Sequence, residues 1–265
     1  MKSNIGGIYF DNVTMEEAVE SIRDMARGGT GPHLVCTANL DHLASLRKDS
    51  EFRDIYTTAD LILADGMPIV WVSKFGPVPL KERVAGSDLL FSLAAESERS
   101  GLKLFFLGGK PGAASKTAEI FARKYPGIKI VGADCPDPCV LNTPEEDARI
   151  CDLVTSSGTD VLLVGFGAPK QEKWISAHRD SLKVPVSIGV GAAFDMAAGM
   201  VRRAPRWMQR SGLEWAFRLI QEPRRLYGRY LGNDLPYLVH LLRESIRERK
   251  RVDPSRAASK PNTLL

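Results

Sequence analysis

The sequence predicts an α/β protein in which a mostly parallel sheet carries helices on both faces and is followed by a C-terminal helical appendage. Short apolar runs rich in β-branched residues alternate with segments of helical periodicity, which is the pattern of strand–helix–strand units. Several of these runs are apolar throughout, as expected of strands that are buried on both faces of a parallel sheet. From Arg202 onward no further strand is predicted, so the alternation ends there.

Seven runs are expected to form strands, at residues 5–10, 33–37, 61–64, 104–107, 129–131, 160–164 and 185–190. A capping box, Thr14-Met-Glu-Glu17, predicts a helix that ends near Arg27. Further helices are expected over residues 87–100, 113–124 and 144–156, the last with Thr143 as N-cap and Pro144 at its first position. This order is typical of Rossmann-like folds, in which ligands bind beyond the carboxyl ends of the strands.

The region from Arg202 is expected to form short helices, because Pro205, Pro223 and Pro236 interrupt it. Its apolar residues recur at helical spacing, at Leu213, Ala216, Phe217 and Ile220 and again at Leu235, Leu238, Val239, Leu242 and Ile246. The tail after Val252 is polar and is predicted to be disordered. The sequence thus predicts an α/β domain over residues 1–201, a basic amphipathic appendage over 202–251 and a disordered tail over 252–265.

Composition and charge restrict the class of protein. Of the 265 residues, 44% are hydrophobic and 26% are charged, which excludes a disordered, a collagen-like or a polytopic membrane protein. The charge is segregated, with a net −5 over residues 1–201 and a net +9 over residues 202–265. The basic segment is therefore expected to meet an anionic partner.

The cysteines and the N-terminus predict a cytoplasmic location. Cys36, Cys135, Cys139 and Cys151 lack the spacing of a zinc site and are expected to be free thiols, as in a reducing compartment. The first residues contain no apolar stretch typical of a signal peptide, and no run of about 18 apolar residues could span a bilayer. Peripheral attachment to a membrane stays open.

Polar side chains follow two of the predicted strands. Thr37 and Asn39 can cap the next helix, or they can direct a hydroxyl and an amide into a cleft. Asp65 ends an apolar strand, where it is either a helix cap or a general base for a sugar hydroxyl. Arg83 is either a surface charge or a further residue of the same site.

Glycine-rich turns or small residues follow three other strands. Such turns let backbone N–H groups approach a phosphate at a helix N-terminus, although the pattern here is neither a P-loop nor a dinucleotide fingerprint. Lys170 and Gln171 stand at the start of a helix, where they suit a phosphate or a sugar hydroxyl. The small residues before Asp195 follow another strand, and close packing of a helix on that strand is the alternative explanation for them. The candidate binding residues are Gly108, Gly109, Gly167, Lys170, Gln171 and Asp195.

No metal site and no cofactor are predicted. The four histidines are scattered, and no Asp-x-Asp pair is present to hold a divalent ion against a nucleotide-sugar. Side chains would then have to neutralise a diphosphate leaving group. Arginine suits this role best, because it is permanently charged and binds in a bidentate manner.

An ordered set of motifs resembles the WecG/TagA/CpsF glycosyltransferases, family 26. The motifs run in order from about Ile5 to Leu242, and GFGAPKQEKW and RAPRWMQ…LEW are the specific ones. They are Thr37-Ala-Asn39, Ala64-Asp65-Gly-Met-Pro68, Glu82-Arg83-Val-Ala-Gly-Ser-Asp88, Phe106-Leu-Gly-Gly109, Gly165-Phe-Gly-Ala-Pro-Lys-Gln-Glu-Lys-Trp174, Gly191-Ala-Ala-Phe-Asp195, Arg203-Ala-Pro-Arg-Trp-Met208, Leu213-Glu-Trp215, Arg218-Leu219 and Glu222-Pro-Arg-Arg225.

The resemblance implies an inverting, metal-independent transferase at the inner face of the cell membrane. Such an enzyme moves a sugar from a UDP donor to a polyprenyl-diphosphate-linked sugar during cell-envelope or exopolysaccharide assembly. The sugar would be N-acetylmannosamine, its uronic acid or glucose. The resemblance leaves the oligomeric state open, including a homo-oligomer.

The same resemblance assigns roles to individual residues. Asp65 matches the general base, and Thr37, Asn39, Arg83 and Gln171 match pocket residues. Asp195 and the region of Gly109 would lie on the nucleotide side. The appendage would dock on the membrane and supply Arg218 and Arg225 to the site. Arg229 is added from helical spacing, because Gly228 leaves no basic side chain one position earlier.

The residues alone leave two other functions open. A strand followed by Gly108-Gly109 is found in nicotinamide-dependent oxidoreductases, although the expected glycine spacing is absent. A basic tail also occurs in nucleic-acid-binding modules, although no recognition-helix motif is present and the transferase interpretation predicts no nucleic-acid partner. Trp207, Trp215, Tyr227 and Tyr230 within the basic segment suit an anionic membrane interface, or they form the core of a hairpin packed on the sheet.

Overall fold

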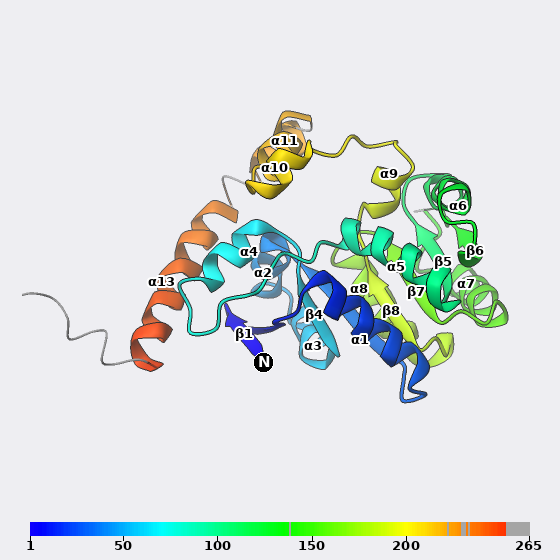
Figure 1. The fold of residues 1–265 in the computed structure, drawn as a ribbon, viewed down its shortest axis with the longest axis horizontal. Coiled ribbons are helices and arrows are strands. Elements are labelled where there is room, and N and C mark those ends of the chain that lie inside the picture. Colours follow the sequence, from blue (N-terminus) through cyan, green and yellow to red (C-terminus); the bar gives the residue numbers. More distant parts are fainter. Residues whose placement is uncertain (138, 222, 229–231, 233, 253–265) are drawn as a thin grey trace, which may run out of the picture.

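The computed structural model describes the chain except for residues 138, 222, 229–231, 233 and 253–265 (Figure 1). The predicted disordered tail and Arg229 therefore lie outside the described residues.

A six-stranded parallel sheet forms the centre of the molecule. Its strand order is β4-β3-β8-β7-β5-β6, and every neighbouring pair is parallel. The strands are β3 (His33–Ala38), β4 (Leu61–Ala64), β5 (Lys103–Gly108), β6 (Lys129–Asp134), β7 (Val161–Gly165) and β8 (Val186–Gly189). The predicted parallel sheet is confirmed, and because the strands are parallel their carboxyl ends meet along one edge.

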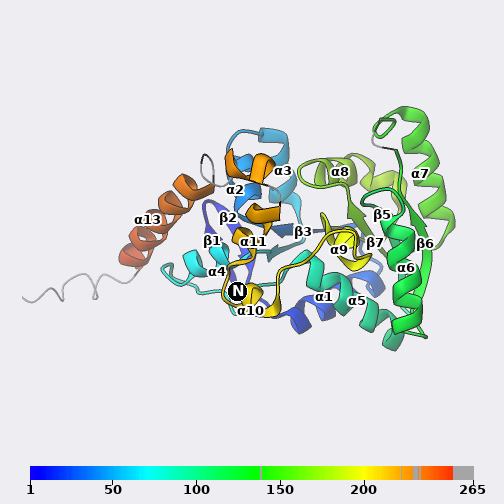
Figure 2. The same ribbon diagram turned by 90° about the horizontal axis from the view of Figure 1, so that it is seen from above.

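Helices cover both faces of this sheet, as predicted (Figure 2). Side chains on β5 alternate between two core clusters, with Phe105 and Leu107 in one and Leu104 and Phe106 in the other. The first face packs against α2 (Leu40–Leu46), α3 (Ser50–Thr58), α4 (Met67–Ser73), α7 (Pro144–Ser156) and α8 (Lys170–Leu182). The second packs against α1 (Met15–Arg27), α5 (Gly86–Ser100), α6 (Ala113–Lys124) and α9 (Ala193–Ala197).

The predicted helix starts are confirmed by their capping bonds. The Thr14 hydroxyl accepts from the backbone N–H of Glu17 at 3.2 Å, and the Thr14 N–H donates to the Glu17 carboxylate at 2.8 Å. The Thr143 side chain accepts from the N–H of Glu146 at the start of α7. Because each cap satisfies N–H groups that the helix itself leaves open, these helices begin where the sequence indicates.

The single strand predicted over residues 5–10 is wrong. The segment forms a hairpin of β1 (Lys2–Ile5) and β2 (Ile8–Asp11), which pair antiparallel as a separate two-stranded sheet. Gly6 and Gly7 form the turn with φ angles of +61° and +81°, a conformation that glycine adopts without steric cost. The two glycines thus reverse the chain in the middle of the apolar run.

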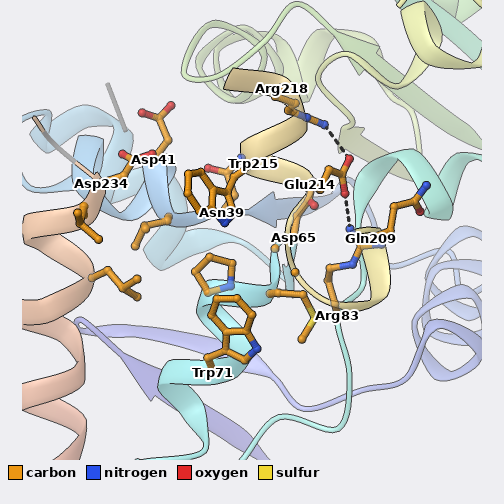
Figure 3. Close-up of a pocket in the computed structure, with 17 residues that line it drawn as sticks. Asn39, Asp41, Asp65, Trp71, Arg83, Gln209, Glu214, Trp215, Arg218 and Asp234 are labelled. Carbon is orange, nitrogen blue, oxygen red and sulfur yellow. Dashed lines mark hydrogen bonds and ion pairs between the residues drawn. The ribbon is translucent and has the colours of Figure 1, made fainter. Parts of the chain in front are cut away.

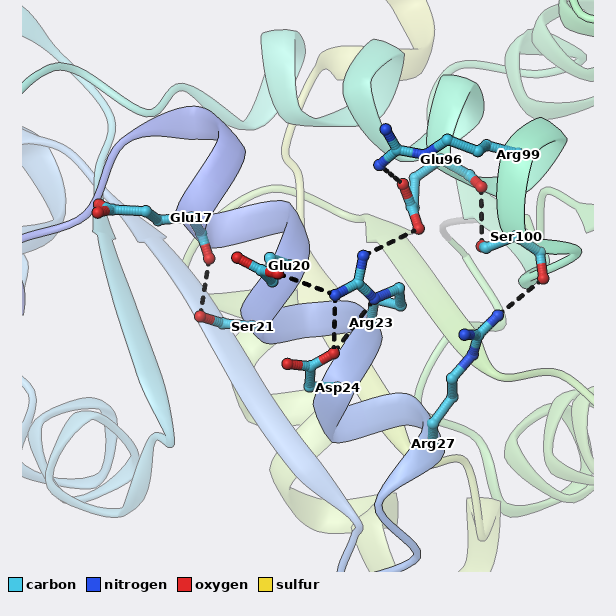
Figure 4. A network of polar contacts seen from close by, with 9 residues as sticks. All are labelled: Glu17, Glu20, Ser21, Arg23, Asp24, Arg27, Glu96, Arg99 and Ser100. Carbon is cyan, nitrogen blue, oxygen red and sulfur yellow. Dashed lines mark hydrogen bonds and ion pairs between the residues drawn. The ribbon is translucent and has the colours of Figure 1, made fainter.

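Charged side chains link α1 to α5 on one face of the sheet (Figure 4). Arg23 of α1 lies 3.7 Å from the buried carboxylate of Glu96 on α5, which Arg99 also contacts. Arg27 donates to the carbonyl oxygen of Ser100 at 2.8 Å. These contacts fix the two helices side by side at a distance from the carboxyl edge of the sheet.

The appendage crosses from α9 to the other end of the sheet (Figure 1). It contains α10 (Arg206–Arg210), α11 (Glu214–Gln221), α12 (Pro223–Tyr227) and α13 (Leu235–Val252), and no strand among the residues described from Arg202 onward. The expectation of short helices is wrong for α13, which has 18 residues. Pro236 does not interrupt it, because proline is tolerated in the first turn of a helix.

One face of α13 packs on the body of the protein. Tyr237 and Leu241 are buried in the same core cluster as the first face of the sheet. They lie so close to Gly6 that a Cβ atom there would be 2.7 Å from a methyl carbon of Leu241. On the other face of α13 the side chains of Leu235, Val239 and Ile246 are exposed. Of the predicted apolar stripe, only Leu238 and Leu242 pack against this cluster, and the buried Tyr237 and Leu241 are not part of the prediction.

Candidate active site

A pocket of about 260 Å³ lies between the carboxyl edge of the sheet and the appendage (Figure 3). On the side of the sheet it is lined by the turns after β3 and β4 and by α2 and α4. On the opposite side it is lined by α10, α11, α13 and the turns beside them. The lining residues are Asn39, Leu40, Asp41, Asp65, Gly66, Met67, Pro68, Trp71, Arg83, Gln209, Gly212, Glu214, Trp215, Arg218, Asp234, Leu235 and Leu238.

Asp65 lies in this pocket directly after β4. Its backbone N–H donates to the carbonyl of Ala38 at 2.8 Å, which continues the pairing of β3 with β4 past the strand end. One carboxylate oxygen accepts from the N–H of Gly86 at 3.3 Å. Burial raises the pKa of Asp65, while the nearby guanidinium groups of Arg218 and Arg83 oppose that rise. The side chain is thus a partly enclosed carboxylate whose pKa two nearby cations influence.

Glu214 bridges two of the four arginines that are predicted for the site. One of its oxygens lies 3.0 Å from Arg83 and the other lies 3.4 Å from Arg218 (Figure 3). Arg83 belongs to the body and Arg218 to α11, so this carboxylate joins the two parts across the pocket. Any anion that binds both guanidinium groups has to share them with Glu214.

Asn39 and Thr37 are placed differently, although both follow β3. Asn39 lines the pocket and also caps α2, where its side chain accepts from the N–H of His42. Thr37 is buried outside the pocket lining, and its hydroxyl donates to the carbonyl of Gly189 at 2.8 Å. The structure therefore gives Thr37 a bond that holds β3 to the end of β8, and gives Asn39 both a capping bond and a place in the pocket.

The glycine-rich turn after β5 lies outside the lining of this pocket. Gly108 and Gly109 have φ angles of +99° and +86°, and the backbone N–H of Lys110 donates to the carboxylate of Asp195 at 2.7 Å. Asp195 is buried, and a Cβ at Gly109 would lie 3.1 Å from it. These predicted binding residues come together with one another rather than with Asp65.

The turn after β7 is held by a buried amide. The side-chain oxygen of Gln171 accepts from the N–H groups of Gly167 and Gly191 at 3.1 and 3.0 Å, and its nitrogen donates to Glu172 at 2.8 Å. Gln171 therefore ties the turn after β7 to the turn after β8 and does not line the pocket, while Lys170 is exposed.

Glu172 is a buried carboxyl group beneath this turn. One of its oxygens accepts from Gln171, and the other has no hydrogen-bond partner. Burial raises the pKa of Glu172 to about 7. The group is therefore more easily protonated in the folded protein than in the unfolded chain.

Glu172→Gln is expected to stabilise the protein at high pH and to change little at low pH. The raised pKa means that the favourable contribution of protonated Glu172 is complete below pH 4.5 and is lost as the pH rises through about 7. Glutamine does not ionise, so it should increase the free energy of unfolding by about 3 kcal/mol at pH 8. Denaturant unfolding at pH 4.5 and pH 8 measures this difference. An equal effect of the substitution at both pH values would contradict the assignment.

The remaining predicted site residues are two arginines of the appendage. Arg225 belongs to α12, but its side chain is not among those described, and Arg229 lies outside the described residues. Sequence reasoning missed Trp71, Gln209, Glu214 and Trp215 as lining residues. The motif LEW contains two of these four residues, but nothing in the sequence indicates which atoms they face.

No group of three or more His, Cys, Asp or Glu side chains is arranged to hold a metal ion in the described part of the chain. No helix among those described has the length and apolar character needed to cross a bilayer.

Comparison with known proteins places the chain in a family. The model of the glycosyl transferase WecG/TagA/CpsF family matches residues 3–251. A relative from Bacillus spizizenii strain W23, named N-acetylglucosaminyldiphosphoundecaprenol N-acetyl-beta-D-mannosaminyltransferase, is 33% identical over 191 residues, which are 72% of each chain. A relative of the same name from Bacillus subtilis strain 168 is 31% identical over 192 residues, 72% of this chain and 73% of that one. This protein is a glycosyltransferase and belongs to the WecG/TagA/CpsF family.

Proposed function

We propose that this glycosyltransferase moves N-acetylmannosamine from a UDP donor to an N-acetylglucosamine linked through a diphosphate to a polyprenyl lipid. The names of the two relatives support the transferred sugar and the acceptor. The observation that carries the proposal is the position of Asp65, a partly enclosed carboxylate in a pocket flanked by Arg83 and Arg218. Family membership favours this reaction over nicotinamide-dependent redox chemistry and over binding of nucleic acid.

The reaction is a single displacement. Asp65 accepts the proton of the acceptor hydroxyl while that oxygen attacks the anomeric carbon of the donor. The bond from the anomeric carbon to the diphosphate breaks, and UDP leaves with the bonding electron pair. A β-linked product from an α-linked donor requires attack from the face opposite UDP, so the configuration inverts.

Guanidinium groups neutralise the departing diphosphate without a metal ion. Arg83 and Arg218 are close enough to Asp65 to influence its pKa, and Arg225 follows on α12. A guanidinium binds phosphate oxygens in a bidentate manner and holds its charge at every physiological pH. Gly108, Gly109 and Asp195 form the nucleotide side of the site, where the positive φ angles of the two glycines bring the backbone of the turn close to the Asp195 carboxylate.

A transfer assay tests the proposal. The purified chain is incubated with UDP-N-acetylmannosamine, its uronic acid analogue or UDP-glucose, and with a short-chain polyprenyl-diphospho-N-acetylglucosamine. We expect one disaccharide product, with a β linkage by NMR and unchanged yield in EDTA. A folded chain that transfers none of these sugars would overturn the donor and acceptor assignment. Activity that is lost in EDTA and restored by Mn²⁺ would overturn the metal-independent reaction.

The appendage is also proposed to hold the enzyme at the inner face of the cell membrane. Its exposed apolar side chains include Trp207, Ile220 and Tyr227, which are 63%, 77% and 62% exposed. They accompany the net charge of +9 over residues 202–265. Aromatic and aliphatic side chains beside basic residues are typical of segments that lie on anionic lipid surfaces.

Ile220→Ala is expected to weaken binding to vesicles that contain phosphatidylglycerol. Loss of most of an aliphatic side chain from the lipid interface should lower the affinity about tenfold. Co-sedimentation with vesicles at several salt concentrations measures the affinity. The matched control is Leu153→Ala, which removes an exposed side chain from α7 in the body. Equal binding by the two variants would contradict docking through Ile220.

A further inference from the structure

Five side chains of alternating charge form a chain of ion pairs at the junction of body and appendage. Arg203 lies 2.6 Å from one oxygen of Asp88, and Arg83 lies 2.8 Å from the other. Arg83 also lies 3.0 Å from one oxygen of Glu214, whose other oxygen lies 3.4 Å from Arg218. Each carboxylate thus contacts two guanidinium groups, one through each oxygen.

The outer pair of this chain lies outside the pocket. Arg83, Glu214 and Arg218 belong to the pocket lining, whereas Asp88 and Arg203 do not. Asp88 is in the first turn of α5, and Arg203 precedes α10 in the segment that leaves α9. A substrate in the pocket can therefore contact Arg83 directly, while Asp88 holds Arg83 from outside the lining and Arg203 holds Asp88.

Arg203 is bound in an unusual way for a residue that serves stability alone. Its Nη1 contacts Asp88, but its Nε and Nη2 are buried without a hydrogen-bond partner. Leaving buried N–H groups of a cation unpaired is unfavourable. Arg203 does provide a second positive charge beside Asp88. The negative charge of Asp88 is therefore shared between Arg203 and Arg83, and it neutralises Arg83 only in part.

We infer that Asp88 and Arg203 are positioning residues for sugar transfer, which orient the guanidinium of Arg83 and keep its charge available to the diphosphate of the donor. This inference rests on the proposed function. Asp88 fixes one end of the Arg83 guanidinium while Glu214 holds the other, so both of its terminal nitrogens are constrained. Arg203 holds Asp88 in turn.

Charges of this chain also act on Asp65. Arg218, Arg83 and Glu214 influence its pKa, and Arg203 and the buried Tyr56 of α3 interact with it electrostatically. Asp41 of α2 and Asp234 are further carboxyl groups that line the same pocket. Loss of the positive charge of Arg203 should raise the pKa of Asp65, and loss of the negative charge of Asp88 should lower it. Two substitutions that break the same ion pair are therefore expected to shift the acidic limb of the pH profile in opposite directions.

The test compares Asp88→Asn and Arg203→Met in the full chain. We expect each to raise the KM for the UDP-sugar about tenfold. Arg203→Met should also move the acidic limb of kcat/KM to higher pH, and Asp88→Asn should move it to lower pH. The double variant should be no worse than the more impaired single variant, because both act through Arg83. Arg203→Lys should restore most of the affinity.

The matched control is Arg23→Met, which breaks a contact with Glu96 at the far end of α5. The inference is overturned if Asp88→Asn and Arg203→Met lower only the thermal stability, and if their KM values and acidic limbs equal those of Arg23→Met. Shifts of the limb in the same direction would also overturn it. If Arg203→Met does not fold, Asp88→Asn and Arg203→Lys carry the comparison. A wild-type chain that transfers no sugar would overturn the proposed function, and this inference with it.

Discussion

Asp65→Asn is expected to lower the turnover number for sugar transfer by about a thousandfold, because it removes the general base. The amide has nearly the same shape as the carboxylate but cannot accept the proton of the acceptor hydroxyl. Asp65 lies among cations in the pocket rather than in the apolar core, so the fold and the binding of UDP should persist. Single-turnover kinetics and calorimetric titration with UDP measure the two effects separately.

The pH profile provides a second measurement on the same residue. The raised pKa of Asp65 predicts that wild-type activity falls on the acidic side at a higher pH than an exposed aspartate would give. Asp152→Asn, an exposed carboxylate of α7, is the matched control and should behave as the wild type. Normal turnover by Asp65→Asn, with the acidic limb unchanged, would remove Asp65 from the mechanism.

Gly212→Ala is expected to lower kcat/KM about a hundredfold by misplacing the walls of the pocket. Gly212 lies between α10 and α11 with a φ angle of +74°, and a Cβ atom there would collide with the ring of Trp71. A second close contact, at 2.9 Å, would be made with Met67. Either the Trp71 ring turns or α11 withdraws with Arg218, and both changes alter the pocket. Steady-state kinetics and limited proteolysis of the appendage measure the result.

The control for Gly212→Ala separates backbone strain from collision. Gly101, which ends α5, has nearly the same φ angle of +75°, but a Cβ atom there meets nothing within 4 Å. Gly101→Ala should therefore cost about 1 kcal/mol of stability and leave the kinetics unchanged. Equal kcat/KM values for Gly212→Ala and Gly101→Ala would show that the close approach of Gly212 to Trp71 does not determine the position of α11.

Elements with local signals could be predicted from the sequence. The helix over residues 144–156 has the predicted bounds, because Thr143 and Pro144 define its first turn within a few residues. The sequence also predicts the strand Leu61–Ala64 at its observed bounds, because an apolar run ends at Asp65. In both cases the information lies within the segment itself.

The partners of the site residues could not be predicted, because they come from distant parts of the chain. The Thr37 hydroxyl bonds to Gly189, 152 residues away, and the Arg83 side chain bonds to Glu214, 131 residues away. The residue types indicate what each side chain can bind, but only the fold decides which groups are within reach. For the same reason, Gln171 suits a sugar hydroxyl by type and yet holds two turns together.

The two sides of the pocket come from distant parts of the sequence, and this affects when the site can form during synthesis. One side contains Asn39 and Asp65, and the other contains Trp215 and Arg218. During translation the sheet is complete only when its inner strand β8 has emerged from the ribosome, and α11 emerges after β8. A nascent chain at that stage has the carboxylate but lacks the opposing wall. Catalytic competence is thus acquired only after α11 has emerged, so translation products that end before Glu214 are expected to be inactive.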